Sequence, residues 1–323
     1  MSQDRISEYL SQFSQTRSVM IDQLRRVVVG QAEVIEQILG AIFTRGHCLL
    51  VGVPGLAKTL MVSSISQILD VAFKRIQFTP DLMPSDITGT TVLDEQEGGR
   101  RNFRFVHGPI FANIILADEI NRTTPKTQSA LLEAMNENQV TIENVTYALP
   151  RPFMVLATQN PIEHHGTYPL PESQLDRFLM RIEVGYPDPA AEKEILKRFS
   201  NGNHHYAAET VLDPTEVVLL QEQSRKVHID DSIVDYMIHI VNRTREHPEI
   251  ELGISPRGTA ALFRATQALA MIDGRSFALP DDVKKLAHPI FEHRLVLARS
   301  GARLRTGAKR VLAEIVDQVP VPA

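Results

Sequence analysis

Residues 48–59 read Cys48-Leu49-Leu50-Val51-Gly52-Val53-Pro54-Gly55-Leu56-Ala57-Lys58-Thr59. The apolar run at the start predicts a buried strand, and the glycine-rich turn leads to a lysine–threonine pair that opens a helix. In such a turn, backbone N–H groups and the positive end of the helix dipole surround phosphate oxygens. The stretch therefore predicts a nucleotide phosphate loop that follows a strand of an α/β sheet.

The side chains of this loop have distinct expected roles. Lys58 would reach the outer phosphates as a point charge, and the Thr59 hydroxyl would ligate Mg²⁺. Ala57 stands where the usual pattern has glycine, and we expect it to be tolerated if its backbone keeps a negative φ. The residues of this loop that are expected to bind the nucleotide are Gly52, Pro54, Gly55, Leu56, Ala57, Lys58, Thr59 and Leu60.

Polar residues also follow two further apolar runs. Asp118 and Glu119 come after Ile114–Ala117, and Asn160 comes after Phe153–Thr158. Because ligands of doubly wound sheets bind at the carboxyl ends of the strands, these side chains are predicted to face the phosphates. Asp118 would hold Mg²⁺, Glu119 would orient the attacking water, and Asn160 would position that water or touch the γ-phosphate. The alternatives are an exposed acidic turn and a simple Asn-Pro turn.

Two arginines and one turn complete the candidate site. Arg177 and Arg257 are cationic candidates for stabilising charge on a transferring phosphoryl group, often from a neighbouring subunit, although single arginines more often form surface ion pairs. Ser255 is the predicted N-cap of the helix that carries Arg257. The turn at Val29, Gly30 and Gln31 could contact adenine through backbone groups, or could simply be the entry to a helix.

The order of elements predicts two domains. Helices are expected over residues 1–28 and Ala32–Phe43, and β-hairpins are expected around Thr90–Val106 and Gln139–Leu149. Strands that alternate with helices favour a parallel sheet covered on both faces. After Tyr186-Pro187-Asp188-Pro189 the pattern becomes helical, which places a boundary between residues 1–186 and 187–323. The helices expected there are Ala190–Phe199, Pro214–Ser224, Asp231–Arg245, Pro256–Met271 and Pro280–Leu286.

Composition narrows the class of protein. The chain has 323 residues, a formal net charge of −5 and a sequence pI near 6.1, so no overall basic charge suggests a nucleic-acid binder. Its single cysteine, Cys48, excludes intramolecular disulfides and cysteine-based zinc sites, and we expect it to be buried. A basic stretch near the end is expected to form a solvated or inter-subunit helix face: Arg294, Arg299, Arg303, Arg305, Lys309 and Arg310.

Other patterns argue for a cytoplasmic protein without a metal cluster of its own. The first residues are polar, and no apolar run approaches the roughly 18 residues that would span a bilayer. The histidine pairs His164-His165 and His204-His205 lack the i, i+4 spacing of helical metal ligands and are expected in solvated loops.

Together these segments resemble the MoxR family of AAA+ ATPases over essentially the whole chain. The motifs that carry the resemblance are Val28–Gln31, Gly52–Thr59, Leu116–Arg122, Ala157–Pro161, Leu175–Phe178 and Ile254–Gly258. The phosphate loop of that family also commonly has alanine at the place of Ala57. The resemblance implies an α/β fold, an AAA+ P-loop parallel-sheet core with β-hairpin insertions, followed by a small all-helical lid domain. Magnesium-chelatase ATPase subunits and replicative helicases share the two insertions, the helix-2 insert and the one preceding sensor 1.

The resemblance also implies roles, cofactors and partners. Residue by residue, it implies Walker A at Lys58 and Thr59, Walker B at Asp118 and Glu119, sensor 1 at Asn160, the trans arginine finger at Arg177, sensor 2 on the lid at Arg257 and a further inter-subunit arginine at Arg122. It implies ATP and Mg²⁺ as cofactors, a homo-hexamer, and a partner with a von Willebrand factor A domain. Members of the family are thought to act as chaperone-like ATPases that mature or activate protein complexes; the sequence does not name the client.

Two other functions remain open from the sequence. A nucleic-acid motor could use basic residues of the first hairpin, Arg100, Arg101 and Arg104, but the acidic net charge and the lack of a recognisable DNA-binding module argue against it. A nucleotide-gated scaffold, in which ATP sets the assembly state, is a second alternative. A complete catalytic set argues against the scaffold, because a pure binding module has no need for Glu119.

Overall fold

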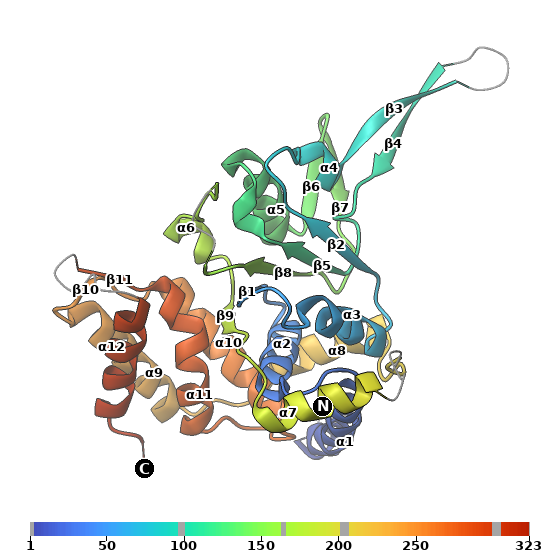
Figure 1. The fold of residues 1–323 in the computed structure, drawn as a ribbon. Helices are drawn as coiled ribbons and strands as arrows, with labels where there is room; N and C mark the ends of the chain where they lie inside the picture. The colour runs from blue at the N-terminus through green and yellow to red at the C-terminus, as the bar shows by residue number, and fades with distance from the viewer. Residues whose placement is uncertain (1–2, 96–100, 163–165, 201–206, 299–304, 323) are drawn as a thin grey trace.

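A five-stranded parallel sheet forms the centre of the amino-terminal half (Figure 1). The structure, a computed structural model, describes residues 3–95, 101–162, 166–200, 207–298 and 305–322. The strands run in the order β2-β5-β8-β1-β9, and each neighbouring pair is parallel. Their bounds are β1 Cys48–Val51, β2 Phe73–Gln77, β5 Ile114–Asp118, β8 Met154–Gln159 and β9 Met180–Glu183. The predicted parallel sheet is confirmed, and the edge strand β9 is an element that the sequence analysis did not predict.

Alternate residues of the strands pack into two separate hydrophobic clusters. Cys48 and Leu50 of β1 face the cluster that contains α2 and α3, whereas Leu49 and Val51 face the cluster that contains α5. A strand that is apolar at every position therefore fits a sheet covered on both faces. The helices of this half are α1 Gln3–Val27, α2 Ala32–Thr44, α3 Lys58–Ile68, α4 Pro84–Thr88, η1 Ile120–Arg122, α5 Pro125–Glu137 and α6 Glu172–Leu175.

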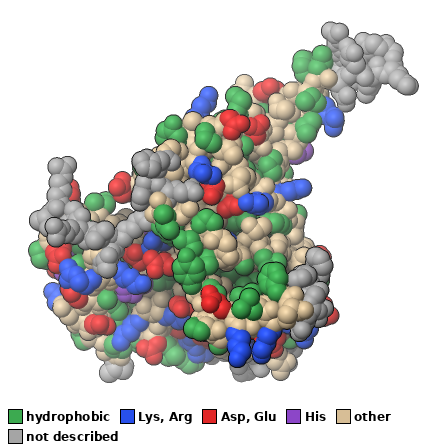
Figure 2. Space-filling model, viewed as in Figure 1, with side chains coloured by type: hydrophobic (Ala, Val, Ile, Leu, Met, Phe, Trp, Pro, Cys, Tyr) green, Lys and Arg blue, Asp and Glu red, His purple; other side chains and the backbone are tan. Residues whose placement is uncertain are grey.

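Both predicted β-hairpins are present. β3 (Gly89–Glu95) pairs with β4 (Arg101–His107), and β6 (Gln139–Ile142) pairs with β7 (Val145–Ala148), each pair antiparallel. The β3–β4 hairpin projects away from the body of the molecule, and hydrophobic side chains lie at its surface (Figures 1 and 2). Aromatic contacts join the two hairpins at their base, where the rings of Phe105 and Tyr147 stack with centroids 4.6 Å apart.

The second half is helical, as the sequence predicts. Its elements are α7 Pro189–Ser200, α8 Pro214–Ser224, α9 Asp231–Glu246, β10 Ile250–Leu252, α10 Pro256–Ile272, α11 Pro280–Phe291, η2 Glu292–Arg294, β11 Val296–Leu297 and α12 Arg305–Gln318. Helix α11 continues past the predicted end at Leu286 and accommodates Pro289 near its carboxyl terminus. The small β10–β11 pair was not predicted, whereas α12 carries part of the predicted basic helix face.

Local capping explains why several helices begin where the sequence predicts. The Asp213 side chain accepts a hydrogen bond from the backbone N–H of Glu216 at the start of α8, and the Ser255 hydroxyl accepts one from Gly258 at the start of α10. Thr124 is the N-cap residue of α5, and its side chain makes no capping hydrogen bond. Pro125 at the first helical position is sufficient to start that helix.

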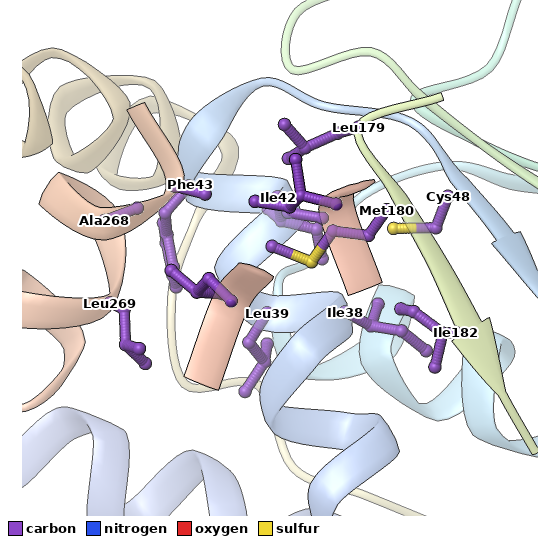
Figure 3. Packing of buried hydrophobic residues seen from close by; sticks show 14 of the residues in the cluster. Ile38, Leu39, Ile42, Phe43, Cys48, Leu179, Met180, Ile182, Ala268 and Leu269 are labelled. Atoms are coloured by element: carbon purple, nitrogen blue, oxygen red, sulfur yellow. The ribbon is translucent and has the colours of Figure 1, made fainter. Parts of the chain in front are cut away.

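Helix α2 connects the two halves. Its side chains lie between those of β9 on one side and those of α10 on the other (Figure 3). The labelled members of this packing are Ile38, Leu39, Ile42, Phe43, Cys48, Leu179, Met180, Ile182, Ala268 and Leu269. One hydrophobic cluster therefore spans both halves, and the boundary after residue 186 stays a prediction.

The prediction of an exposed basic helix face is wrong for one of its residues, Arg294. Arg294 is buried, with 4% of its side chain exposed, because it packs between the helical half and the segment before β9, where it binds Asp176. Lys309 and Arg310 are exposed as expected and pair with Glu183 and Glu249. Arg299 and Arg303, the side chain of Arg305 and the pairs His164-His165 and His204-His205 lie outside what the structure describes. Among the described residues, no helix has the length and apolar character needed to cross a membrane.

A buried histidine bridges two elements on one side of the sheet. His47 Nε2 lies 3.0 Å from the carbonyl oxygen of Met135, and the backbone N–H of Val155 donates to its Nδ1 at 2.9 Å. Nδ1 is therefore the acceptor, and Nε2 carries the proton that is donated to Met135. Burial lowers the pKa of His47 from 6.5 to about 4.

We expect acid to destabilise the protein through His47. Because the folded state lowers this pKa, the stabilisation is complete above pH 6.5 and is lost as the pH falls towards 4. Between pH 7.5 and pH 5 this amounts to roughly 2 kcal/mol. In urea unfolding, the wild type should exceed His47→Gln in free energy of unfolding at pH 7.5, and this difference should shrink at pH 5. An equal difference at both pH values would show that His47 does not titrate in this way.

Candidate nucleotide-binding site

A cavity of about 940 Å³ opens where β5, β8 and the phosphate loop meet. It is lined by side chains from the turn after α1, the phosphate loop and the ends of β5 and β8, segments that lie apart in the sequence. The predicted site residues that line it are Val29, Pro54, Gly55, Leu56, Ala57, Lys58, Thr59, Leu60, Asp118, Glu119 and Asn160. Gly30, Gln31, Gly52, Arg177 and Arg257 do not line this cavity.

The phosphate loop contains one backbone conformation that differs from expectation. Ala57 has φ 54° and ψ 23°, in the left-handed region, so the expected negative φ is wrong. The chain must reverse direction between the loop and α3, and the left-handed residue makes that reversal immediately before Lys58. A non-glycine residue in this region costs roughly 1 kcal/mol, which explains why glycine is usual here.

The rest of the loop is shaped to admit phosphate groups. Gly55 has φ +87°, and a Cβ added to it would enter open space, so the backbone presents an uncovered surface there. Gly52 is different, because a Cβ would lie 2.5 Å from the carbonyl oxygen of Val184 on the neighbouring chain segment. Its own carbonyl oxygen accepts a hydrogen bond from Lys58 Nζ at 2.6 Å. Gly52 thus contributes to the loop by close packing and by holding Lys58.

The environment of Lys58 sets its charge state. Burial lowers the pKa of this amine, while Asp118 and Glu119 oppose the shift by favouring the charged form. The lysine is therefore a partly desolvated cation at the amino terminus of α3, where its attraction to phosphate is stronger than in bulk water.

A hydroxyl from the adjacent strand binds the Asp118 carboxylate and the backbone of Glu119. Thr158 Oγ1 donates to Asp118 Oδ1 at 2.6 Å and accepts from the backbone N–H of Glu119 at 2.8 Å. Glu119 has φ 58°, so the chain turns sharply between the two acids and points their side chains differently. Thr158 is fully buried. Thr158 was not predicted as a site residue, although its place near the end of β8 was a usable signal.

Cationic and amide side chains surround the same carboxylates. Arg75 pairs with Asp118 Oδ2 at 2.6 Å, and Gln77 Nε2 donates to Glu119 Oε2 at 2.8 Å. Arg122, which the resemblance places between subunits, contacts Glu119 Oε2 of its own chain at 2.9 Å. Arg75 and Gln77 were missed, because β2 lies next to β5 only through the sheet order.

Asn160 lies at the predicted place and also forms the turn that was the alternative. Its side chain lines the cavity, and its Oδ1 also accepts a hydrogen bond from the backbone N–H of Ile162 at 3.2 Å. The turn after β8 therefore holds the amide at the mouth of the cavity.

An apolar part of the cavity lies beside the end of α1. It is formed by Val27, Val28 and Val29 together with Ile195 and Phe199 of α7. Such a surface suits a flat heterocyclic base, which buries its faces against apolar side chains. The contacts of α7 could not be anticipated from local spacing.

Gly30 and Gln31 hold the adjoining linker instead of lining the cavity. Gln31 Nε2 donates to the carbonyl oxygen of Gly185 at 2.9 Å. Gly30 has φ +79°, and a Cβ on it would lie 2.7 Å from Ala191 Cβ. Both residues thus fix the linker and the start of α7 beside the cavity.

Arg177 and Arg257 lie together at a different place. Arg177 Nη1 donates to the carbonyl oxygen of Leu132 at 2.7 Å, beside a hollow of about 310 Å³ that Asn136 also lines. Arg257 Nη2 donates to Asn136 Oδ1 at 3.1 Å. The structure therefore brings these two arginines to the carboxyl end of α5 and away from the nucleotide cavity of their own chain.

The oxygen atoms of the cavity can be compared with those that Mg²⁺ needs as ligands. No group of three or more histidine, cysteine, aspartate or glutamate side chains among the described residues could hold a metal by itself. Mg²⁺ commonly binds through one or two protein oxygens, substrate phosphates and water. Thr59 and Asp118 both line the cavity, which fits that requirement.

We expect the left-handed conformation of Ala57 to be measurable. Ala57→Gly should leave stability unchanged or raise it by up to about 1 kcal/mol, because glycine removes the strain. The matched control is Ala260→Gly on the exposed face of α10, which should lower stability by about 1 kcal/mol. Thermal unfolding would compare the two variants; equal losses of stability would contradict the assigned conformation.

We also expect the hydroxyl of Thr158 to contribute more to stability than the volume of its side chain does. Thr158→Val leaves Asp118 Oδ1 and the N–H of Glu119 without this partner and should cost about 1–3 kcal/mol. Thr158→Ser keeps the hydroxyl and should retain most of the stability. Denaturant unfolding of both variants measures the difference, and equal losses would point to packing rather than hydrogen bonding.

Comparison with known proteins agrees with this geometry. Residues 47–180 match the ATPase family associated with various cellular activities (AAA), and residues 242–315 match the AAA lid domain. The chain is 40% identical over 311 residues to the protein named Chaperone MoxR1 of Mycobacterium tuberculosis, covering 94% of this chain and 81% of the relative. It is 44% identical over 302 residues to YeaC of Bacillus subtilis, described as uncharacterized, covering 94% and 93%.

A solved structure is similar over the full length. A protein of Cytophaga hutchinsonii, provisionally described as an ATPase, is 41% identical with a TM-score of 0.89, covering 99% of this chain and 98% of its own. The α/β core with its hairpin insertions and the helical lid are therefore shared with a solved structure. On these matches, and on the site built above, the chain belongs to the MoxR family of AAA+ ATPases.

Proposed function

We propose that the protein hydrolyses ATP as an oligomer and uses the turnover to remodel, mature or activate a protein complex. The observation that carries this proposal is the distribution of polar groups. Lys58, Thr59, Asp118, Glu119 and Asn160 meet in one cavity. The two arginines suited to stabilise a phosphoryl group lie elsewhere on the chain, so a second copy would have to supply them.

The residues of the cavity have complementary roles in this reaction. The phosphate loop and the amino terminus of α3 would bind the phosphates, with Lys58 compensating charge on the outer groups. Glu119 would orient the attacking water, and Asn160 would hold it or the γ-phosphate. Thr59 and Asp118 would hold Mg²⁺, which supplies charge neutralisation on the phosphates.

The arginines would act across a subunit contact. Arg177 and Arg257 both contact the carboxyl-terminal half of α5, near Asn136. Both would therefore face the same neighbouring copy. A guanidinium that reaches the transferring phosphoryl group typically accelerates the reaction by about 10³- to 10⁵-fold. A closed ring, of which a hexamer is the form implied by the family, would place every cavity next to such a pair.

The wider setting is also part of the proposal. A chaperone-like action is supported by the name of the relative MoxR1. The family resemblance implies a partner with a von Willebrand factor A domain. A cytoplasmic location is proposed from the lack of a long apolar run in the sequence. The formal net charge of −5 favours a protein client over nucleic acid.

Glu119→Gln is the direct test of this function. It keeps the size and hydrogen-bonding capacity of the side chain but removes the base, so ATP turnover should fall by about 10²- to 10⁴-fold while ATP binding persists. The matched control is Glu251→Gln, at an exposed position in β10, which should leave turnover unchanged. The assay measures phosphate release, together with particle size with and without ATP.

The other outcomes select between functions. If the wild type also fails to hydrolyse ATP but ATP still changes particle size, the nucleotide-gated scaffold is favoured. If DNA binds in a salt-dependent manner and stimulates turnover, the nucleic-acid motor is favoured.

A further inference from the structure

Arg294 is a buried lid residue that contacts the segment carrying Arg177. It is the last residue of η2, directly after α11, and 4% of its side chain is exposed. A long cationic side chain is rarely so buried unless its donors are satisfied. The acceptors of its hydrogen bonds therefore show which segments Arg294 holds in place.

These acceptors lie on both sides of Arg177. Nε donates to Asp176 Oδ1 at 2.7 Å, and Nη2 donates to the carbonyl oxygens of Phe178 at 2.6 Å and Asp176 at 3.3 Å. Nη1 donates to the carbonyl oxygens of Leu179, at 3.1 Å, and Ile290. Because a guanidinium is rigid and planar, it fixes the relative positions of all these groups at once.

The backbone held in this way directs Arg177 towards α5. Residues 176–179 form the short connection between α6 and β9, and Phe178 within it is fully buried. The side chain of Arg177 leaves this connection to reach the carbonyl oxygen of Leu132. The direction of the Arg177 side chain therefore depends on a connection that Arg294 holds through hydrogen bonds.

The stem of Arg294 also packs against the helix that carries Arg257. A Cβ added to Gly258, the next residue along α10, would lie 3.1 Å from Arg294 Cδ and 2.7 Å from Ile254 Cγ2. Burial lowers the pKa of Arg294, the hydrogen bond and charge of Asp176 oppose that shift, and the charge of Arg257 adds to it. One side chain therefore lies between the segments that carry both arginines.

The lid also contacts the nucleotide cavity of the same chain. Ile195, Arg198 and Phe199 of α7 line that cavity. The helical half of the chain therefore contributes both to the wall of the cavity and, through Arg294, to the connection before β9.

We propose that Arg294 is a positioning residue that sets Arg177, and with it Arg257, for action on the neighbouring subunit. This inference rests on the proposed function, in which Arg177 completes the site of another copy. Arg294 does not line the nucleotide cavity of its own chain, so its loss should lower turnover in the neighbour without weakening ATP binding.

Arg294→Lys and Asp176→Asn test this inference from the two sides of the contact. Lysine keeps the charge but cannot bond the carboxylate and the flanking carbonyls together, and asparagine removes the charge of the acceptor. We expect kcat to fall by about 10- to 100-fold for Arg294→Lys, with a smaller loss for Asp176→Asn, since misplacing a catalytic group by about 1 Å has that effect. Binding of a fluorescent ATP analogue should change by less than about twofold on the same reasoning.

The matched control is Arg275→Lys. Arg275 makes a comparably close, two-pronged contact with the buried Asp282, but that contact lies wholly within the lid. It should lose thermal stability as Arg294→Lys does and keep its kcat. Equal losses of kcat in the two lysine variants would overturn the proposal, because any buried lid arginine would then have the same effect.

Mixed oligomers separate a positioning role from misfolding. Lys58→Ala subunits should not turn over ATP, but they would still offer an intact Arg177 to a neighbour. Mixed with Arg294→Lys subunits, or with Asp176→Asn if the lysine variant does not fold, they should give more activity than the two preparations measured apart. Arg177→Ala mixed with Lys58→Ala is the reference for the same rescue.

The failures are distinguishable. Rescue with Arg177→Ala but none with Arg294→Lys or Asp176→Asn would overturn the role of Arg294 and leave the split site intact. Wild-type turnover by Arg177→Ala alone would overturn the split site itself, and the present inference with it.

Discussion

The burial of α2 between the sheet and the lid is the contact on which the rest of the structure depends. Side chains of α2 pack against β9 on one side and α10 on the other, within a hydrophobic cluster that spans both halves of the chain. Separating the lid would expose this surface to water, at roughly 25 cal/mol for each Å² of apolar area. The lid is therefore held close to the sheet, where α7 can line the cavity and Arg294 can reach β9.

Two residues of the site keep a backbone conformation that only surrounding structure can impose. Ala57 and Glu119 are both left-handed, one before Lys58 and the other directly after Asp118. Such conformations persist when neighbours over-determine them, as the Thr158 hydroxyl does by accepting from the N–H of Glu119. The strain fixes where the lysine and the two carboxylates point before any nucleotide arrives.

The cavity and the pair of arginines divide the chemistry between two regions of the chain. The cavity holds groups that bind phosphate and direct water, whereas Arg177 and Arg257 meet at the end of α5. In this arrangement α5 is central, because its preceding turn carries Glu119 and Arg122 and its carboxyl-terminal half accepts hydrogen bonds from both arginines.

The sequence alone determined the features that depend on neighbours along the chain. These include the apolar strands β1, β5 and β8, the phosphate loop, the proline-started helices α5, α8 and α10, and the placing of Asp118, Glu119 and Asn160 at strand ends. Only the tertiary structure decided the edge strand β9, the sign of φ at Ala57, the contacts of Arg75, Gln77 and Thr158, and the burial of Arg294. Capping, turn and periodicity signals act over a few residues. Arg294 binds Asp176, which lies 118 positions earlier in the chain. Such a contact forms only when distant elements pack together.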